Sequence, residues 1–179
     1  MSTSKRVAIL TGGGDVPGLN VCLKSLVYRT IDEGFEPIGV RKGWQGLINY
    51  NYHDPTTYGD NFIELTKNMV RPIDRTPGSF LHSSRVDPLH LPSQQVPKFM
   101  KQPGGDTVDL TKHIKEVVER LGFRTLITIG DDNMACIYLV HLEDVIELAL
   151  SRLSRQLTCQ ERVAYLHEDL LCLPQTPVP

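Results

Sequence analysis

Consecutive glycines directly after a short apolar run constrain the fold of this chain more than any other feature. The run, Val7 to Leu10, is typical of a buried strand, and Gly12-Gly13-Gly14 follows it almost at once. Apolar residues then recur at helical spacing up to Gly34, which predicts a helix with one apolar face. That face carries Leu23, Leu26, Val27, Thr30 and Ile31. A second strand around Ile38 to Val40 completes the order strand, helix, strand, which predicts a right-handed crossover and a parallel sheet.

The composition is that of an ordinary soluble protein with one domain, or one domain and an appendage. The 179 residues are 40% hydrophobic and 22% charged, with a formal net charge of −2. A chain of this length can bury a core without help from disulfides or metal. Because the charge is near neutral and lysines and arginines do not cluster, we expect neither nucleic acid nor an anionic membrane as a partner.

The cysteines and the N-terminal residues predict a cytoplasmic protein. Only four apolar residues precede the first glycines, too few for a signal peptide, and no run is long enough to span a membrane. The four cysteines show no paired spacing that suits zinc or a redox dithiol, which favours a reducing compartment and a packing role for them. They are Cys22, Cys136, Cys159 and Cys172.

The middle of the chain is predicted to be mostly ordered loop. Seven of the twelve prolines lie between Asp54 and Pro103, and they exclude a long helix or a central strand there. Within this part, Ser79 to His82 is expected to form a short strand and Pro92 to Met100 a short helix.

Regular structure is expected to return after the proline-rich part. Thr107 to Leu121 has the spacing of an amphipathic helix that stops at Gly122, and Thr125 to Ile129 reads as a strand buried on both faces. Cys136 to Leu157 is predicted as a helix. We therefore expect an α/β region over residues 1–135 and a helical C-terminal segment with a proline-rich tail over residues 136–179.

The glycine-rich turn from Thr11 to Asn20 is the first candidate site. Glycines allow backbone N–H groups to approach an anion, and the N-terminus of the following helix adds partial positive charge, so a phosphate is the natural ligand. The dinucleotide-binding spacing is not met, because Asp15 stands where that motif has glycine, and no phosphate-loop lysine follows. The alternative is a tight turn with a purely structural role.

Two further signals lie at Gly130-Asp131-Asp132-Asn133 and at Arg85. The first follows a predicted parallel strand, where open α/β sheets place their ligands, and its oxygens suit magnesium; the alternative is a helix cap. Arg85 follows Ser83 and Ser84, and arginine suits bidentate binding of phosphate; the alternative is an ordinary surface arginine.

Together and in this order, these motifs resemble the phosphofructokinase family. The resemblance covers residues 6 to about 135 and rests on Val7 to Asn20, Arg41 to Leu47, Phe80 to Arg85 and Leu126 to Asp132. It implies an α/β fold with an open, mainly parallel sheet and helices on both faces, incomplete relative to the family. It also implies a 6-phosphofructokinase activity in glycolysis, the transfer of a phosphoryl group from ATP or diphosphate to fructose 6-phosphate.

The resemblance assigns roles to individual positions. Gly14 and Arg85 fall where the family contacts the phosphoryl donor, and Gly130, Asp131, Asp132 and Asn133 fall on the stretch that lies along it. Asp131 falls on the position that serves Mg²⁺. Asp132 stands where ATP users have glycine, and this residue and Arg41 are similar to the diphosphate-dependent branch.

Three departures from the family's pattern limit what the resemblance implies. One glycine is missing before Asp131, and Pro77 replaces a glycine. The Thr-Ile-Asp-Asn-Asp segment that holds the family's catalytic base does not follow Asn133, so no catalytic residue is identified and the acceptor site is largely missing. We therefore expect a truncated or fused gene product.

Three functions remain open at this stage. The first is a phosphofructokinase-type phosphotransferase, and the second is a remnant that binds nucleotide or diphosphate without catalysis. The third is a helical interaction module attached to an incomplete sheet. Association into a homo-oligomer is left open by the sequence.

Overall fold

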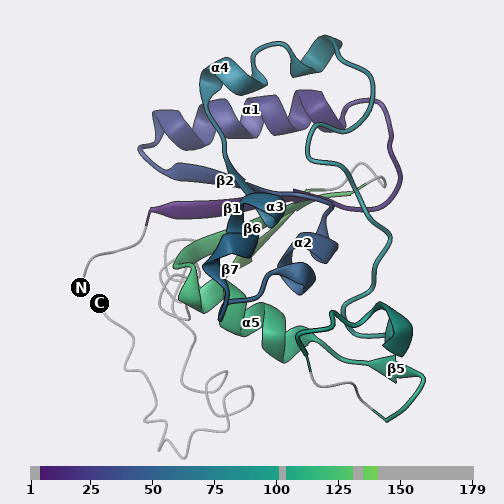
Figure 1. Cartoon of the computed structure of the whole chain (residues 1–179). Coiled ribbons are helices and arrows are strands. Elements are labelled where there is room, and N and C mark those ends of the chain that lie inside the picture. Colours follow the sequence, from purple (N-terminus) through teal and green to yellow (C-terminus); the bar gives the residue numbers. More distant parts are fainter. Residues whose placement is uncertain (1–4, 101–103, 131–134, 141–179) are drawn as a thin grey trace, which may run out of the picture. The chain divides into compact units, whose positions relative to one another are not determined.

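The first strand, helix and second strand form the unit that the sequence predicts (Figure 1). The computed structural model describes residues 5–100, 104–130 and 135–140. Strand β1 spans Arg6–Thr11, helix α1 spans Leu19–Asp32 and strand β2 spans Glu36–Val40. Strands β1 and β2 are parallel, with Ala8 opposite Ile38. The apolar pattern therefore gives the crossover unit that positions the glycine-rich turn.

Three parallel strands make up the centre of the sheet, and an antiparallel strand lies at each edge. The order is β3-β2-β1-β6-β7, in which β6 is Phe123–Ile129 and pairs in parallel with β1. The edge strands are β3, Phe62–Glu64, and β7, Ala135–Leu139. The expectation of an open, mainly parallel sheet is confirmed for its three central strands.

Helices cover both faces of this sheet (Figure 1). On one face, α1 packs against α4, Lys67–Val70, and the 3-10 helix η2, Ile73–Arg75. The other face carries α2, α3 and α5. Their bounds are Trp44–Asn49, Tyr58–Asn61 and Thr111–Arg120.

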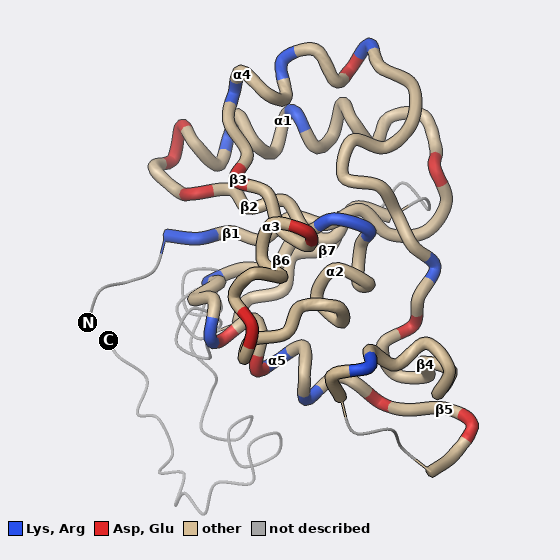
Figure 2. Tube along the Cα trace, viewed as in Figure 1, with Lys and Arg blue, Asp and Glu red and all other residues tan. Residues whose placement is uncertain are grey.

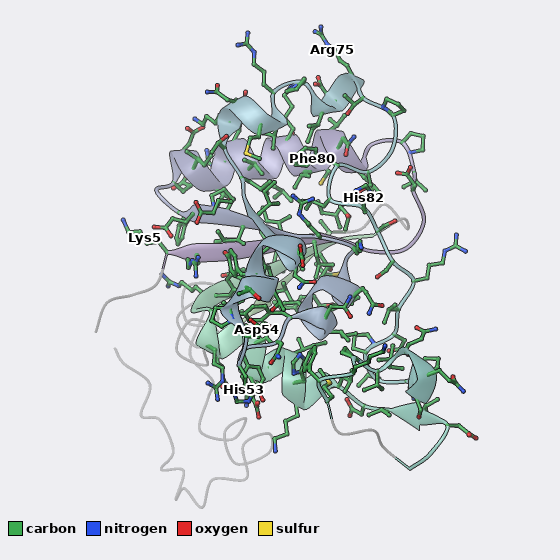
Figure 3. The ribbon with its side chains drawn as sticks, viewed as in Figure 1. Lys5, His53, Asp54, Arg75, Phe80 and His82 are labelled. Atoms are coloured by element: carbon green, nitrogen blue, oxygen red, sulfur yellow. The ribbon has the colours of Figure 1, made fainter. Side chains whose placement is uncertain are left out.

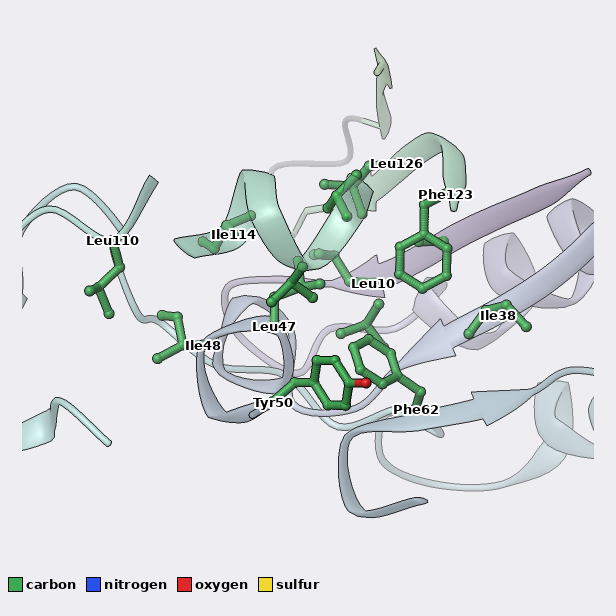
Figure 4. Close-up of a cluster of buried hydrophobic side chains, with 14 of the residues drawn as sticks. Leu10, Ile38, Leu47, Ile48, Tyr50, Phe62, Leu110, Ile114, Phe123 and Leu126 are labelled. Carbon is green, nitrogen blue, oxygen red and sulfur yellow. The ribbon is translucent and has the colours of Figure 1, made fainter. Parts of the chain in front are cut away.

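Alternation along the strands divides the core into two clusters. Val7 and Ile9 of β1 face the α1 side, while Ala8 and Leu10 face the α5 side. A bulge shifts the register between β1 and β6, so Phe123 and Leu126 both join the α5-side cluster despite their odd spacing. Figure 4 shows this cluster, in which Phe62 and Phe123 meet edge to face at 5.8 Å between ring centroids. Both faces are thus closed by apolar packing, and the ends of the strands remain for binding.

Two predicted elements of the middle segment differ from the structure. Ser79 to His82 forms a turn, because its backbone bonds locally from His82 N to Ser79 O at 3.0 Å. Of the helix predicted from Pro92 to Met100, only Ser93–Gln95 is helical, as the 3-10 helix η3, since prolines on both sides stop its growth. The remaining short elements are η1, Pro55–Thr57, β4, Leu91–Pro92, and β5, Thr107–Val108.

The helix predicted from Cys136 is wrong over its first residues. Residues Ala135–Leu139 form β7, which pairs antiparallel with β6, placing Ile137 opposite Ile127. The apolar content fits either structure, but the unpaired edge of β6 offers backbone hydrogen bonds that a helix there would leave unmade. The rest of the predicted helix, from residue 141 onward, lies outside the described residues.

No helix within the described ranges is long and apolar enough to cross a membrane.

We expect Gly46→Ala to lower the free energy of unfolding by about 2 kcal/mol, because overpacking a tight contact costs energy. A Cβ at Gly46 would lie 2.9 Å from Val40 Cγ1 and closer still to the Arg41 carbonyl oxygen. Gly59→Ala is the control, since nothing lies within 4 Å of its added Cβ. Urea denaturation measures both, and equal midpoints for the two variants would contradict the tight approach of α2 to β2.

Candidate functional site

The candidate site lies at the carboxyl edge of the sheet. Strands β1, β2 and β6 are parallel, so the residues that follow them emerge at the same edge, where open α/β sheets bind ligands. Residues 12–18 follow β1, residues 41–43 follow β2, and Gly130 follows β6. Residues 79–85 reach this edge from the α1 side of the sheet (Figure 3).

Two backbone hydrogen bonds join the glycine-rich turn to the other predicted motifs. Gly12 N donates to Ile129 O at 2.9 Å, and Gly13 N donates to Ser84 O at 3.1 Å. Gly13 has a φ of 79°, a conformation that glycine adopts without strain. The turn therefore lies beside both the residue before Gly130 and the residue before Arg85, which brings together three segments that are far apart in sequence.

Thr11, at the end of β1, fixes the turn at residues 79–82. Its side chain is buried, and its Oγ1 donates to His82 O at 2.7 Å and shares a hydrogen bond of 3.2 Å with Ser79 Oγ. Just after β2, Lys42 N donates to Leu81 O at 2.8 Å. Residues 79–85 are thus held against the ends of two neighbouring strands.

Asn20, in the first turn of α1, anchors the approach to this edge. Its Nδ2 donates to Ile73 O at 2.9 Å and to Gly78 O at 2.8 Å, while its Oδ1 accepts from Phe80 N at 2.9 Å. Phe80 lies beneath α1 and packs against the core on that side (Figure 3). One buried amide therefore connects α1 to both ends of the loop before Arg85.

The start of α1 favours negative charge. Its N-cap residue, Gly18, has a φ of 105° and supplies no side-chain cap, and the first turn holds no acid. The helix dipole at this end is therefore not offset by a carboxylate within the turn.

A hollow of about 160 Å³ lies beside the start of α1. It is lined by residues of the glycine-rich turn, by Ile129 and Gly130, and by Cys22. Burial raises the pKa of the Cys22 thiol, which agrees with a packing role.

The charges of the described edge are mainly basic. Arg41, Lys42 and Arg85 lie in its segments beside one acid, Asp15, whereas both signs are interspersed along the rest of the described chain (Figure 2). Arg85 is exposed, and Gly14 and Gly130 are partly buried. Such a surface suits an anionic ligand.

The magnesium prediction depends on residues outside the described ranges. Asp131, Asp132 and Asn133 belong to this undescribed part, so their roles stay predictions. Among the described residues, no group of three or more histidines, cysteines, aspartates or glutamates is placed to hold a metal ion. A set of metal-binding side chains for Mg²⁺ is therefore not found in the described part of the chain.

Comparison with known proteins agrees with this architecture. The family model named Phosphofructokinase matches residues 6–148, which is most of the chain. The chain belongs to the phosphofructokinase family. The match extends beyond residue 135, where the resemblance based on sequence motifs ended.

Curated phosphofructokinases match the chain over a limited part of their own length. The chain is 34% identical to ATP-dependent 6-phosphofructokinase 3 of Streptomyces coelicolor over 128 residues, which is 71% of this chain and 30% of that protein. It is 39% identical to the pyrophosphate–fructose 6-phosphate 1-phosphotransferase of Dictyoglomus thermophilum over 84 residues, 47% of this chain and 21% of that protein. The chain thus spans less than a third of the length of these relatives.

A solved phosphofructokinase shares the fold. The T-state structure from Pichia pastoris superposes with a TM-score of 0.51 at 21% identity, covering 72% of this chain and 11% of that one. This likeness supports the arrangement of strands and helices that brings the phosphofructokinase motifs to one edge.

The sequence singled out Gly14, Arg85 and Gly130, whose binding roles stay predictions, and it gave no role to the residues that hold these segments in place. Thr11 and Asn20 are part of the glycine-rich motif, yet their partners lie more than fifty positions away in the sequence. Only a signal that paired these distant positions would have identified them.

Asn20→Ala should lower the free energy of unfolding by about 2 kcal/mol, because it removes the side-chain partner of Gly78 O and of Phe80 N and one of the hydrogen bonds to Ile73 O. Urea denaturation gives the value, and limited proteolysis should show faster cleavage around residues 73–80. Asn68→Ala, an exposed asparagine of α4, is the control and should change stability by less than about 0.5 kcal/mol. If both variants unfold alike, Asn20 does not anchor the loop.

Proposed function

We propose that the chain acts in a 6-phosphofructokinase-type phosphotransfer, in which it supplies the binding site for the phosphoryl donor, diphosphate or ATP. The acceptor in this proposal is fructose 6-phosphate. The observation that carries the proposal is the hydrogen bonding of Gly12 to Ile129 and of Gly13 to Ser84, which places the end of β6 and the residue before Arg85 beside the glycine-rich turn. The names of the relatives support both donors, since one is ATP-dependent and another uses pyrophosphate.

The described groups of this edge act by position and charge. The start of α1 faces an anion with partial positive charge, and Arg85 adds a full charge on a segment whose backbone is hydrogen-bonded to the glycine-rich turn. In phosphoryl transfer, catalysis comes mainly from positioning and from electrostatic stabilisation of the transferred group. These residues would hold the donor and offset its charge while the acceptor approaches.

Binding of the donor without transfer is the second candidate. The groups brought together at this edge are a helix N-terminus and guanidinium side chains, both of which bind anions. No catalytic base is assigned among the described residues. Binding and turnover are therefore tested separately.

Calorimetric titration of the full chain with inorganic diphosphate and with ATP tests the binding. We expect Arg85→Ala to weaken binding at least about tenfold, because a charge-assisted hydrogen bond to phosphate is lost. Gly14→Glu should abolish binding by placing a carboxylate in the anion site. Arg29→Ala is the control for Arg85, since Arg29 pairs with Glu33 at 2.7 Å in the last turn of α1, far from its N-terminus. Unchanged binding in both site variants would remove the proposed donor site.

A coupled assay that detects fructose 1,6-bisphosphate tests the transfer. Under the leading proposal, purified chain with fructose 6-phosphate and Mg²⁺ should show turnover with diphosphate or ATP, and Arg85→Ala should reduce it. Turnover no higher than the blank with both donors, combined with tight donor binding, would favour the second candidate instead.

A further inference from the structure

Two buried polar atoms at the carboxyl edge have no hydrogen-bond partner. They are Arg41 Nε and Ser84 Oγ, and no other buried side-chain nitrogen or oxygen in the described ranges shares this condition. Buried polar groups are nearly always paired, so each exception calls for an explanation such as a bound ion, a water or a ligand. Both unpaired atoms lie in segments of the candidate site, which indicates that a ligand bound there would supply their hydrogen-bond partner.

Ser84 Oγ lies directly against the loop that carries Arg41. A Cβ built on Gly43 would be 3.2 Å from Ser84 Oγ and 2.6 Å from Thr11 O, so the loop passes closely over the end of β1 beside this hydroxyl. On its other side, Ser84 O accepts from Gly13 N at 3.1 Å. The unpaired hydroxyl is therefore next to the glycine-rich turn, one residue before Arg85 and near the residues that follow β2.

Backbone strain is concentrated in the same two segments. Lys42 and His82 have φ values of 57° and 59°, and among the described residues they are the non-glycine residues with positive φ. Each is one or two residues from an unpaired atom, and Lys42 N bonds to Leu81 O at 2.8 Å. Strain of this kind collects at ligand clamps, where the surrounding structure holds it in place.

We infer that Ser84 Oγ and Arg41 Nε bind an oxygen of the polyphosphate, in addition to Gly14 and Arg85. Both atoms carry a hydrogen to donate, and a guanidinium cannot accept, so the missing partner is an acceptor. Anionic oxygens meet this need better than a cation, and a polyphosphate carries several of them. The inference rests on the proposed function, because it concerns the same donor site.

Ser84→Ala separates a ligand-binding role from a structural role by two measurements on the full chain. Without ligand, the urea midpoint should equal or exceed that of the wild type, because the hydroxyl that is removed has no partner to lose. In calorimetry with inorganic diphosphate, the dissociation constant should rise about tenfold. Ser25→Ala is the control, since that hydroxyl donates to Val21 O at 2.9 Å on an exposed face of α1, and its dissociation constant should stay within about twofold of the wild type.

Arg41→Lys tests the second atom. It keeps the positive charge but has no Nε–H, so the dissociation constant for diphosphate should again rise about tenfold. If Ser84→Ala and Arg41→Lys bind diphosphate like the wild type while Arg85→Ala does not, the inference is overturned and the proposed function stands. If the wild type binds neither diphosphate nor ATP, the proposed function fails first and this inference fails with it. A lower urea midpoint for Ser84→Ala with unchanged binding would make Ser84 a structural residue.

Discussion

The hydrogen bonding of residues 79–85 to the strand ends is the constraint on which the rest of the site depends. Thr11, Gly13 and Lys42 each bond to this segment, and Asn20 holds the loop that leads into it. The hydrogen bonds made by Thr11 and Asn20 are partly buried, where unpaired polar groups are costly, so the segment has little freedom to lie elsewhere. The position of Arg85 therefore follows from the packing of β1 and β2.

This arrangement leaves an edge that is rich in hydrogen-bond donors. The central strands are closed on both faces by apolar clusters, while their carboxyl ends present a turn of glycines, an uncapped helix start and three basic side chains. Two of the donors are buried without an acceptor. A protein that keeps such groups loses stability in the free state, which is a common property of sites prepared for a ligand.

The sequence predicted the elements whose pattern is local and missed those that depend on a partner. Helix α1 and strands β1, β2 and β6 follow from apolar periodicity, and α5 was predicted a few residues too long at its N-terminal end. Strand β7 was read as helix because its apolar residues fit both periods, and the free edge of β6 decided between them. The expected strand at Ser79 to His82 is a turn. Its carbonyls at His82 and Leu81 accept from Thr11 Oγ1 and Lys42 N, and these bonds do not form the regular pattern of paired strands.

The sequence by itself determined the crossover unit, the glycine-rich turn and the family, because these features depend on residues that are close together or on motifs in a fixed order. Only the tertiary structure decided that Gly13 lies against Ser84 and Gly12 against Ile129, and that Ser84 Oγ and Arg41 Nε are buried without hydrogen-bond partners. The physical reason is that hydrogen bonds between distant segments depend on how the chain packs in three dimensions. Whether a buried donor has an acceptor depends on which distant segment folds beside it.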